Sequence, residues 1–169
     1  MTPLDPASVA CPFETHLPAV LPEWIDYNGH MNVGYYHVAF DTASEAFFHY
    51  LGLTPGFREA NGSTTFALEA HLNFLRELKQ GDPLRFECRL LDYDHKRIHF
   101  YQEMFHGTEG YLAASHESVS AHVAFAIRRT APMPGELLDR LAIIKAAHAG
   151  LERPWQVGHV MSAHPPKKS

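Results

Sequence analysis

The sequence predicts a single α+β domain in which one long helix precedes a run of antiparallel strands. The chain has 169 residues and 46% of them are hydrophobic, which suits one packed core rather than two. Apolar residues repeat with a helical period over residues 33–51 and alternate with a period of two in several segments after residue 63. One long helix together with a run of strands indicates an α+β architecture.

The chain before the helix is expected to hold one short strand and a loop. Residues 1–12 are Pro- and Ala-bearing and are predicted to be a loose N-terminal segment. Residues 13–24 read as a strand interrupted by proline, and such a strand suits a sheet edge because proline cannot donate to a ladder. Residues 26–32 are polar and contain glycine, so we expect a loop there. The domain itself is expected to span residues 13–150, with 151–169 as a C-terminal tail.

The central helix is expected to run from Val33 to Leu51. Nearly all its residues are apolar except for a narrow stripe that recurs every four positions: His37, Asp41, Glu45 and His49. Such a helix is buried on most of its circumference. Asn32 is a suitable N-cap, and Gly52 a suitable C-terminal stop.

Four strands and a second helix are expected after the central helix. The strands are predicted to follow one another as an antiparallel meander over residues 64–74, 84–90, 97–104 and 111–128. In the last of these, the apolar residues fall on one face: Val119, Ala121, Val123, Phe125 and Ile127. Residues 136–149 have the pattern of an amphipathic helix.

Composition excludes several classes of protein. The 14 Lys and Arg residues against 19 Asp and Glu residues give a formal net charge of −5, so the basic excess of a nucleic-acid binder is missing. No apolar run approaches the roughly 20 residues of a membrane helix, and the opening residues do not resemble a secretory signal. We therefore expect a cytoplasmic protein with no membrane partner. Its two cysteines, Cys11 and Cys88, are expected to be free thiols.

The most informative motif lies just before the central helix. Asp26, Asn28 and His30 occupy alternate positions there. The start of a helix offers unpaired amides that can hold an oxyanion, and a neighbouring carboxylate can act as a base or nucleophile. The alternative is a capped loop in which Asp26 and Asn28 form Asx turns and His30 packs.

This stretch resembles the signature of hotdog-fold acyl thioesterases. Asp26-x-x-Gly29-His30-Met31-Asn32 is similar to the Asp-x-x-Gly-His-[Val/Met]-Asn loop of the 4-hydroxybenzoyl-CoA thioesterase-like group, where the Asp is catalytic. The spacing Asp26-x-Asn28-x-His30 is also similar to that of plant acyl-carrier-protein thioesterases, where all three side chains belong to the site. The resemblance continues through residues 72–84 and covers roughly residues 15–128.

Two positions depart from the family pattern. Trp24 stands where many members carry an earlier Asp, and Val33 stands where a second Asn is common. With these changes, the run from Pro22 to His30 looks most like a subgroup linked to carnitine breakdown, the betainyl-CoA thioesterases.

The resemblance implies a hotdog fold, in which a curled antiparallel sheet wraps around the helix. It also implies homodimers at least, a site at the subunit interface, and hydrolysis of an acyl-CoA thioester without a cofactor. Asp26 would attack the thioester or activate water, and Asn28 and His30 would position the reacting groups. Amides at residues 34–36, from Gly34 to Tyr36, would polarise the thioester carbonyl.

Further candidates surround this loop. Four aromatic residues could hold a quaternary ammonium by cation–π attraction, or could simply pack: Trp24, Tyr27, Tyr35 and Tyr36. Glu45 on the helix could support the substrate or catalysis, or could meet solvent or a partner chain. The 13 histidines include no His-Glu-x-x-His pattern, and the cysteines form no Cys-x-x-Cys pair, so we expect no metal.

Two other functions remain open from the sequence. One is a hotdog hydratase or dehydratase acting on hydroxyacyl thioesters, which an assay of enoyl-CoA hydration would detect. The other is a non-catalytic acyl-CoA-binding subunit, which would bind CoA esters without releasing free thiol.

Overall fold

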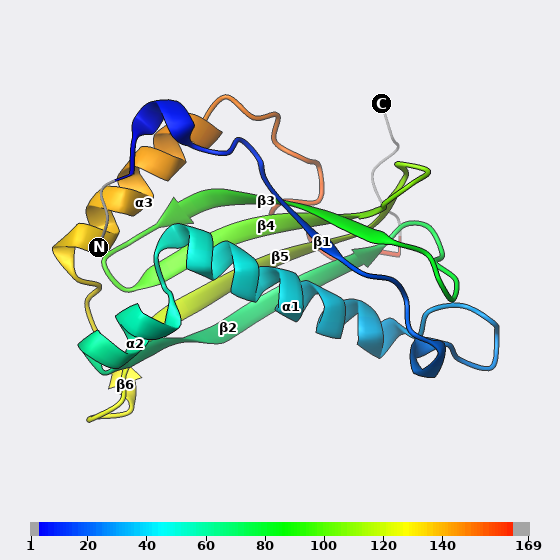
Figure 1. The fold of residues 1–169 in the computed structure, drawn as a ribbon, viewed down its shortest axis with the longest axis horizontal. Helices are drawn as coiled ribbons and strands as arrows, with labels where there is room; N and C mark the ends of the chain where they lie inside the picture. The colour runs from blue at the N-terminus through cyan, green and yellow to red at the C-terminus, as the bar shows by residue number, and fades with distance from the viewer. Residues whose placement is uncertain (1–3, 164–169) are drawn as a thin grey trace.

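The structure is a computed structural model that describes residues 4–163. A curled antiparallel sheet holds the long helix α1 on its concave face (Figure 1). The strands and α-helices follow one another along the chain in this order: β1 (Phe13–Leu17), α1 (Val33–Leu51), α2 (Pro55–Asn61), β2 (Ser63–Phe74), β3 (Leu84–Tyr93), β4 (Arg97–His106), β5 (Leu112–Ala124), β6 (Arg129–Thr130) and α3 (Gly135–His148). The predicted α+β architecture with a sheet around one helix is confirmed. No helix among the described residues is both long and apolar enough to span a membrane.

Helix α1 has the predicted bounds, and both predicted caps are present. The Asn32 side chain accepts a hydrogen bond from the Gly34 amide at 2.9 Å, and Gly52 ends the helix with a φ of 103°. The side of α1 that faces the sheet is fully buried and includes Phe40 and Phe47. Phe40 meets Phe86 of β3 edge-on, and Phe47 contacts Phe100 of β4. These aromatic contacts fix the helix against the centre of the sheet.

The strands do not form one continuous meander. The sheet order is β1-β3-β4-β5-β2, so the predicted meander holds only for β3, β4 and β5. Strand β2 pairs with β5 at the far side of the sheet, and residues 75–83 then carry the chain across to β3. Leu78 in this crossover is fully buried beneath the start of α1. The sequence pattern missed this because alternation shows that a segment is a strand but does not identify its neighbour.

Strand β2 lies at the edge of the sheet: it pairs with β5 on one side, and no described strand pairs with its other side. Several of its apolar side chains are not covered within the chain. The alternation of apolar and polar residues over 64–74 predicts a strand with one buried face, but Phe66, Leu68 and Phe74 are 51%, 54% and 51% exposed in a single chain. A bulge between Ala67 and Glu69 interrupts the pairing with β5. An exposed edge strand of this length invites pairing with another strand.

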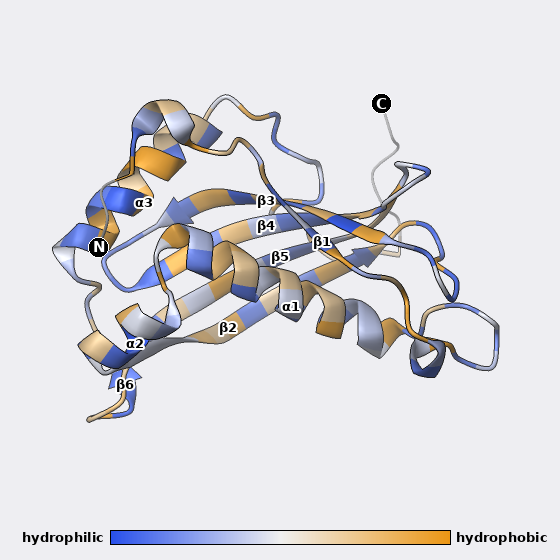
Figure 2. Ribbon diagram, viewed as in Figure 1, coloured by the Kyte–Doolittle hydropathy of each residue, from blue (hydrophilic) through white to orange (hydrophobic). Residues whose placement is uncertain are grey.

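Strand β5 is shorter than predicted, and the face that it turns toward the helix is the one opposite its row of apolar residues. It ends at Ala124, and the chain turns back to pair β6 with β5, which leaves Phe125 53% exposed and Ile127 61% exposed. The face beside α1 carries His116, Ser118 and Ser120, whose partners on β4 include Gln102 and Phe100. Figure 2 shows hydrophilic and hydrophobic residues alternating along the strands. The inner surface of the sheet is therefore partly polar.

The helices α2 and α3 complete the domain. Helix α2 was not predicted, although Thr54 caps it and Pro55 begins it, which is a standard start signal. Helix α3 matches the prediction within one residue and packs on β3, where His148 accepts a hydrogen bond from the Leu90 amide at 2.9 Å. The Nε2 atom of His148 lies 2.8 Å from the Ala10 carbonyl oxygen, which fastens the N-terminal segment to the domain. Cys11 and Cys88 are free, as expected.

Candidate active site

The loop before α1 is a tight hairpin. Ile25 and Met31 form a β-bridge across it, and the Asp26 amide donates to the His30 carbonyl at 3.0 Å. The Gly29 amide donates to the Asp26 carbonyl at 3.0 Å, and Gly29 has a φ of 80°, which a residue with a side chain would adopt only with strain. These bonds hold Asp26 at the base of the hairpin and place Tyr27 and Asn28 at its tip.

The crossover segment, residues 75–83, makes a hydrogen bond and an ion pair to this loop. The Met31 amide donates to the Leu78 carbonyl at 2.8 Å, and the His30 side chain pairs with Glu77 at 2.9 Å. The Asn32 amide donates to the Trp24 carbonyl at 2.8 Å. The position of the loop therefore depends on the long-range connection between β2 and β3.

The side chains of Asp26, Asn28 and His30 do not converge within one chain. One Asp26 oxygen, Oδ1, accepts the Asn28 amide at 2.8 Å, which is the Asx turn of the capped-loop alternative. The other oxygen makes no hydrogen bond to the residues that the structure describes. Asn28 is exposed, and His30 turns toward Glu77 instead of toward Asp26. Asp26 is thus held in a fixed orientation with one carboxylate oxygen available.

One amide at the start of α1 is available to a ligand. The Gly34 amide is occupied by the Asn32 side chain, and the Tyr35 amide donates to the Asn32 carbonyl at 2.9 Å. These were two of the amides expected to polarise a substrate. The Val33 N–H has no acceptor within residues 4–163, so it is the exposed donor nearest the loop. The predicted Asn32 N-cap was the sequence signal for this, because an N-cap side chain accepts a hydrogen bond from an amide of the first turn.

The four aromatic residues of the predicted cage point in different directions. Trp24 and Tyr35 stack on each other with centroids 5.5 Å apart. Tyr27 is 97% exposed, whereas Tyr36 is buried edge-on against Phe74. Burial raises the pKa of Tyr36 to about 12, so its hydroxyl stays protonated. Within one chain, these four rings do not surround a common space.

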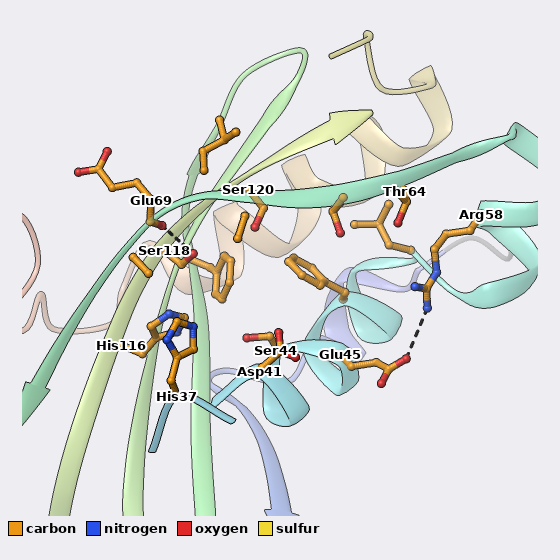
Figure 3. A pocket seen from close by; sticks show the side chains of 17 residues that line it. His37, Asp41, Ser44, Glu45, Arg58, Thr64, Glu69, His116, Ser118 and Ser120 are labelled. Carbon is orange, nitrogen blue, oxygen red and sulfur yellow. Dashed lines mark hydrogen bonds and ion pairs between the residues drawn. The ribbon is translucent and has the colours of Figure 1, made fainter. Parts of the chain in front are cut away.

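A cavity of about 430 Å³ lies farther along α1, between the helix and the inner face of β5 and β2 (Figure 3). Helix α1 contributes three residues of its polar stripe together with a serine and an aromatic ring: His37, Asp41, Glu45, Ser44 and Phe48. The sheet contributes the rings and hydroxyls of the polar inner face: Phe100, His116, Ser118 and Ser120. Glu45 therefore lies in a cavity, as a substrate-binding residue would. Polar residues at alternate positions 116, 118 and 120 were the sequence signal for this cavity.

The charges that line the cavity are only partly compensated. Glu45 lies 3.5 Å from Arg58 of α2 and 3.8 Å from His49. Asp41 makes no hydrogen bond or ion pair in the described part of the chain. The Glu69 carboxylate points away from the cavity in Figure 3. Asp41 is therefore the uncompensated charge of this site.

A buried polar network forms the inner end of the cavity. Gln102 Oε1 accepts from Ser44 Oγ at 2.9 Å and lies 2.9 Å from His116 Nδ1. The His116 proton is therefore on Nδ1, and Nε2 is left buried without a partner. Burial, followed by the neighbouring His37, lowers the pKa of His116 from 6.5 to about 4, so the ring is neutral at pH 7. No group of three or more metal-ligating side chains occurs among the described residues.

Comparisons with known proteins converge on one family. A sequence model of the thioesterase-like superfamily matches residues 20–141. The chain is 38% identical to a betainyl-CoA thioesterase from Pseudomonas aeruginosa, with 89% of this chain and 95% of that protein aligned. It is 34% identical to an L-carnitine dehydrogenase/betainyl-CoA thioesterase from Rhizobium meliloti, over 78% of this chain but only 26% of that longer protein.

Solved structures agree with the fold. A Staphylococcus aureus protein solved in complex with CoA superposes with a TM-score of 0.83 at 28% identity, covering 90% of this chain and 96% of that chain. A 1,4-dihydroxy-2-naphthoyl-CoA thioesterase from Synechocystis superposes with a TM-score of 0.65 at 17% identity, covering 84% of this chain and 98% of that one. At that identity, the second similarity concerns the fold alone.

The neutral state of His116 predicts a pH dependence of stability. The unfolded chain binds a proton at His116 near pH 6.5, whereas the folded chain binds it only near pH 4. The unfolding free energy should therefore fall as the pH drops from about 6.5 to about 4, by up to about 1.4 kcal/mol per pH unit from this residue. Urea unfolding at a series of pH values measures the slope. His116→Gln should flatten it, and an unchanged slope in that variant would contradict the assignment.

Proposed function

This chain belongs to the thioesterase-like superfamily and is an acyl-CoA thioesterase, and we propose that its substrate is betainyl-CoA, with Asp26 as the reacting carboxylate. The observation that carries the choice of substrate is the 38% identity to a betainyl-CoA thioesterase along nearly the full length of both chains. This choice does not depend on the longer relatives that also carry an L-carnitine dehydrogenase name, because the first relative is a separate thioesterase of similar length.

The chemistry proposed for Asp26 follows from its environment. The free Asp26 oxygen takes a proton from water, or attacks the carbonyl carbon directly. The Val33 N–H, at the positive end of α1, stabilises the oxyanion that develops on the carbonyl oxygen. When Asp26 acts as the base, the hydroxide adds to the carbonyl carbon, the C–S bond breaks, and the CoA sulfur takes the proton from Asp26. When Asp26 acts as the nucleophile, the C–S bond breaks to leave an Asp26 acyl anhydride and the CoA thiolate; water then hydrolyses the anhydride, regenerates Asp26, and supplies both the oxygen of the free acid and the proton for the thiolate. Asn28, exposed at the hairpin tip, and His30, paired with Glu77, belong to the same loop and are proposed to position the substrate or water.

A homodimer formed along β2 is part of this proposal. Strand β2 is a 12-residue edge whose apolar side chains at Phe66, Leu68 and Phe74 are half exposed. A second copy of the same strand would pair with the free backbone groups of this edge and cover those side chains. The cavity beside α1 opens along the same strand, since it is lined by Ala67 and Leu68. Dimerisation would therefore help to close it.

We also propose a cytoplasmic location. Free cysteines are typical of a reducing compartment, and the structure shows Cys11 exposed and unpaired.

The substrate assignment is tested by a thiol-release screen over a panel of acyl-CoA esters that includes betainyl-CoA. We expect betainyl-CoA to give the highest kcat/KM, because the relative of similar length is named for that ester. A higher kcat/KM for a neutral short-chain or aromatic ester would contradict the assignment while leaving the thioesterase activity intact.

The role of Asp26 is tested by Asp26→Asn. Asn keeps the shape of Asp and can still form the Asx turn, but it can neither take a proton from water nor act as a carboxylate nucleophile. We expect kcat to fall by about 10²–10⁴-fold with little change in thermal stability. Asn28→Ala and His30→Ala should lower kcat by less than Asp26→Asn does. Near-normal kcat in a folded Asp26→Asn protein would contradict the mechanism and would direct attention to Glu45.

The dimer is tested by placing a charge on the exposed edge. Leu68→Glu should shift the sedimentation mass from twice the 19.0 kDa chain mass toward a single chain, because a buried carboxylate in the pairing surface is costly. Phe125→Glu is the matched control, since Phe125 is similarly exposed but lies outside the edge strand. A wild-type mass near 19.0 kDa at micromolar concentration would refute the dimer.

A further inference from the structure

We propose that the cavity between α1 and β5 binds the quaternary ammonium of the acyl group, with Asp41 as its counter-ion and with the partner subunit supplying the reacting carboxylate. The inference rests on the proposed function, because it assumes a cationic acyl group. It assigns a role to Asp41, which lines this cavity (Figure 3) and lies eight residues along α1 from Val33, where the Asp26 loop ends.

The charge balance of the cavity fits a single positive charge. Arg58 lies 3.5 Å from Glu45 and offsets it, whereas Asp41 has no partner in the portion of the chain that the structure describes. One net negative charge therefore remains at the cavity, on the Asp41 side chain, which is exposed in a single chain. Cover of the cavity by a partner subunit would remove water from around this carboxylate and so strengthen its attraction for a cation. A neutral acyl group would leave Asp41 uncompensated.

The remaining walls suit methylated ammonium better than a hydrogen-bonding cation. Phe48 and Phe100 meet edge-on at 5.3 Å and offer aromatic surface, which attracts a quaternary ammonium. His116 is 4% exposed, and its Nε2 carries a buried lone pair without a donor. Because the ring is uncharged, His116 lines the cavity without repelling a cation.

The inner face of β5 carries small polar side chains where apolar side chains would pack against the helix. Ser118 and Ser120 are both buried at positions where a sheet normally presents apolar side chains to a helix. Ser118 is satisfied by the Glu69 carbonyl at 2.9 Å. Small hydroxyl side chains at successive inward positions leave the gap that larger apolar residues would fill.

The length of the acyl group decides which subunit reacts with it. Val33 and Asp41 are separated along α1 by about 12 Å at 1.5 Å per residue. A betainyl group has only one methylene between its carbonyl carbon and its nitrogen, so it cannot reach both residues of one chain. An ester whose ammonium contacts Asp41 must therefore be attacked by Asp26 of the partner subunit.

The first experiment compares betainyl-CoA with 3,3-dimethylbutanoyl-CoA, in which carbon replaces the nitrogen and removes only the charge. Asp41→Asn should lower the ratio of kcat/KM for betainyl-CoA to that for the neutral ester by about tenfold. Asp139→Asn, an exposed carboxylate change on α3, is the matched control and should leave the ratio unchanged. Equal losses on both esters, or no loss, would overturn the proposal. A fall in the ratio from Trp24→Ala but not from Asp41→Asn would place the cation at the loop and would also overturn it.

A binding measurement separates this proposal from the assigned substrate. Tetramethylammonium should perturb the NMR signals of Phe100 and His116 in the wild type, and much less in Asp41→Asn. If the cation binds there but betainyl-CoA is not hydrolysed, the assigned substrate is wrong and the cation site stands. If betainyl-CoA is the best substrate but tetramethylammonium does not perturb these signals, the function stands and the cation site is wrong.

A hybrid dimer tests the shared site. A dimer with one Asp26→Asn chain and one Asp41→Asn chain, purified with two different tags, has one site in which both carboxylates are native. It should show about half the wild-type activity on betainyl-CoA, because two-fold symmetry gives each dimer two equivalent sites. Activity no higher than the mean of the two parent homodimers would show that both carboxylates act within one chain.

Discussion

The packing of α1 into the concave face of the sheet is the constraint on which the other features depend. Phe40 and Phe47 anchor the helix against Phe86 and Phe100, so its position is fixed by aromatic contacts along one side. Its N-terminus is then held over the crossover, where the Met31 amide meets the Leu78 carbonyl. A helix fixed in this way presents its free Val33 amide and its polar stripe in defined places, and both features enter the proposed chemistry.

The same packing leaves a space that the chain does not fill. Most of the inner surface of the sheet is apolar, but β5 turns His116 and two serines toward the helix. Gln102 joins Ser44 of the helix to His116, and this bridge satisfies the polar groups at the end of the cavity except for His116 Nε2. Burying that network costs desolvation, and a fully apolar core would avoid the cost. A binding role explains why the polar groups are retained.

The two ends of α1 have different roles in the proposed enzyme. The N-terminal end carries the reacting carboxylate on its hairpin and the amide that stabilises an oxyanion. The middle of the helix carries Asp41 and Glu45, which line the cavity. A short acyl group cannot bridge these two regions of one helix. The proposed reaction therefore requires the proposed dimer, which forms along the exposed edge of β2. Pairing of two copies would bring the N-terminal end of one helix toward the cavity of the other.

Local rules determined the helix and the loop, and long-range contacts determined the site. The bounds of α1, its Asn32 and Gly52 caps and the Asp26 hairpin were predictable, because each depends on neighbours within a few residues. The pairing of β2 with β5 was not predictable, because alternation carries no information about a distant partner. The inward turn of Ser118 also depends on distant contacts, since Ser118 pairs with Phe100 of β4, whose ring packs against Phe47 of α1. The sequence by itself thus determined the long helix, the main strands and the loop that carries Asp26, whereas only the tertiary structure decided which face of β5 meets the helix, since a strand has two faces and its packing selects one.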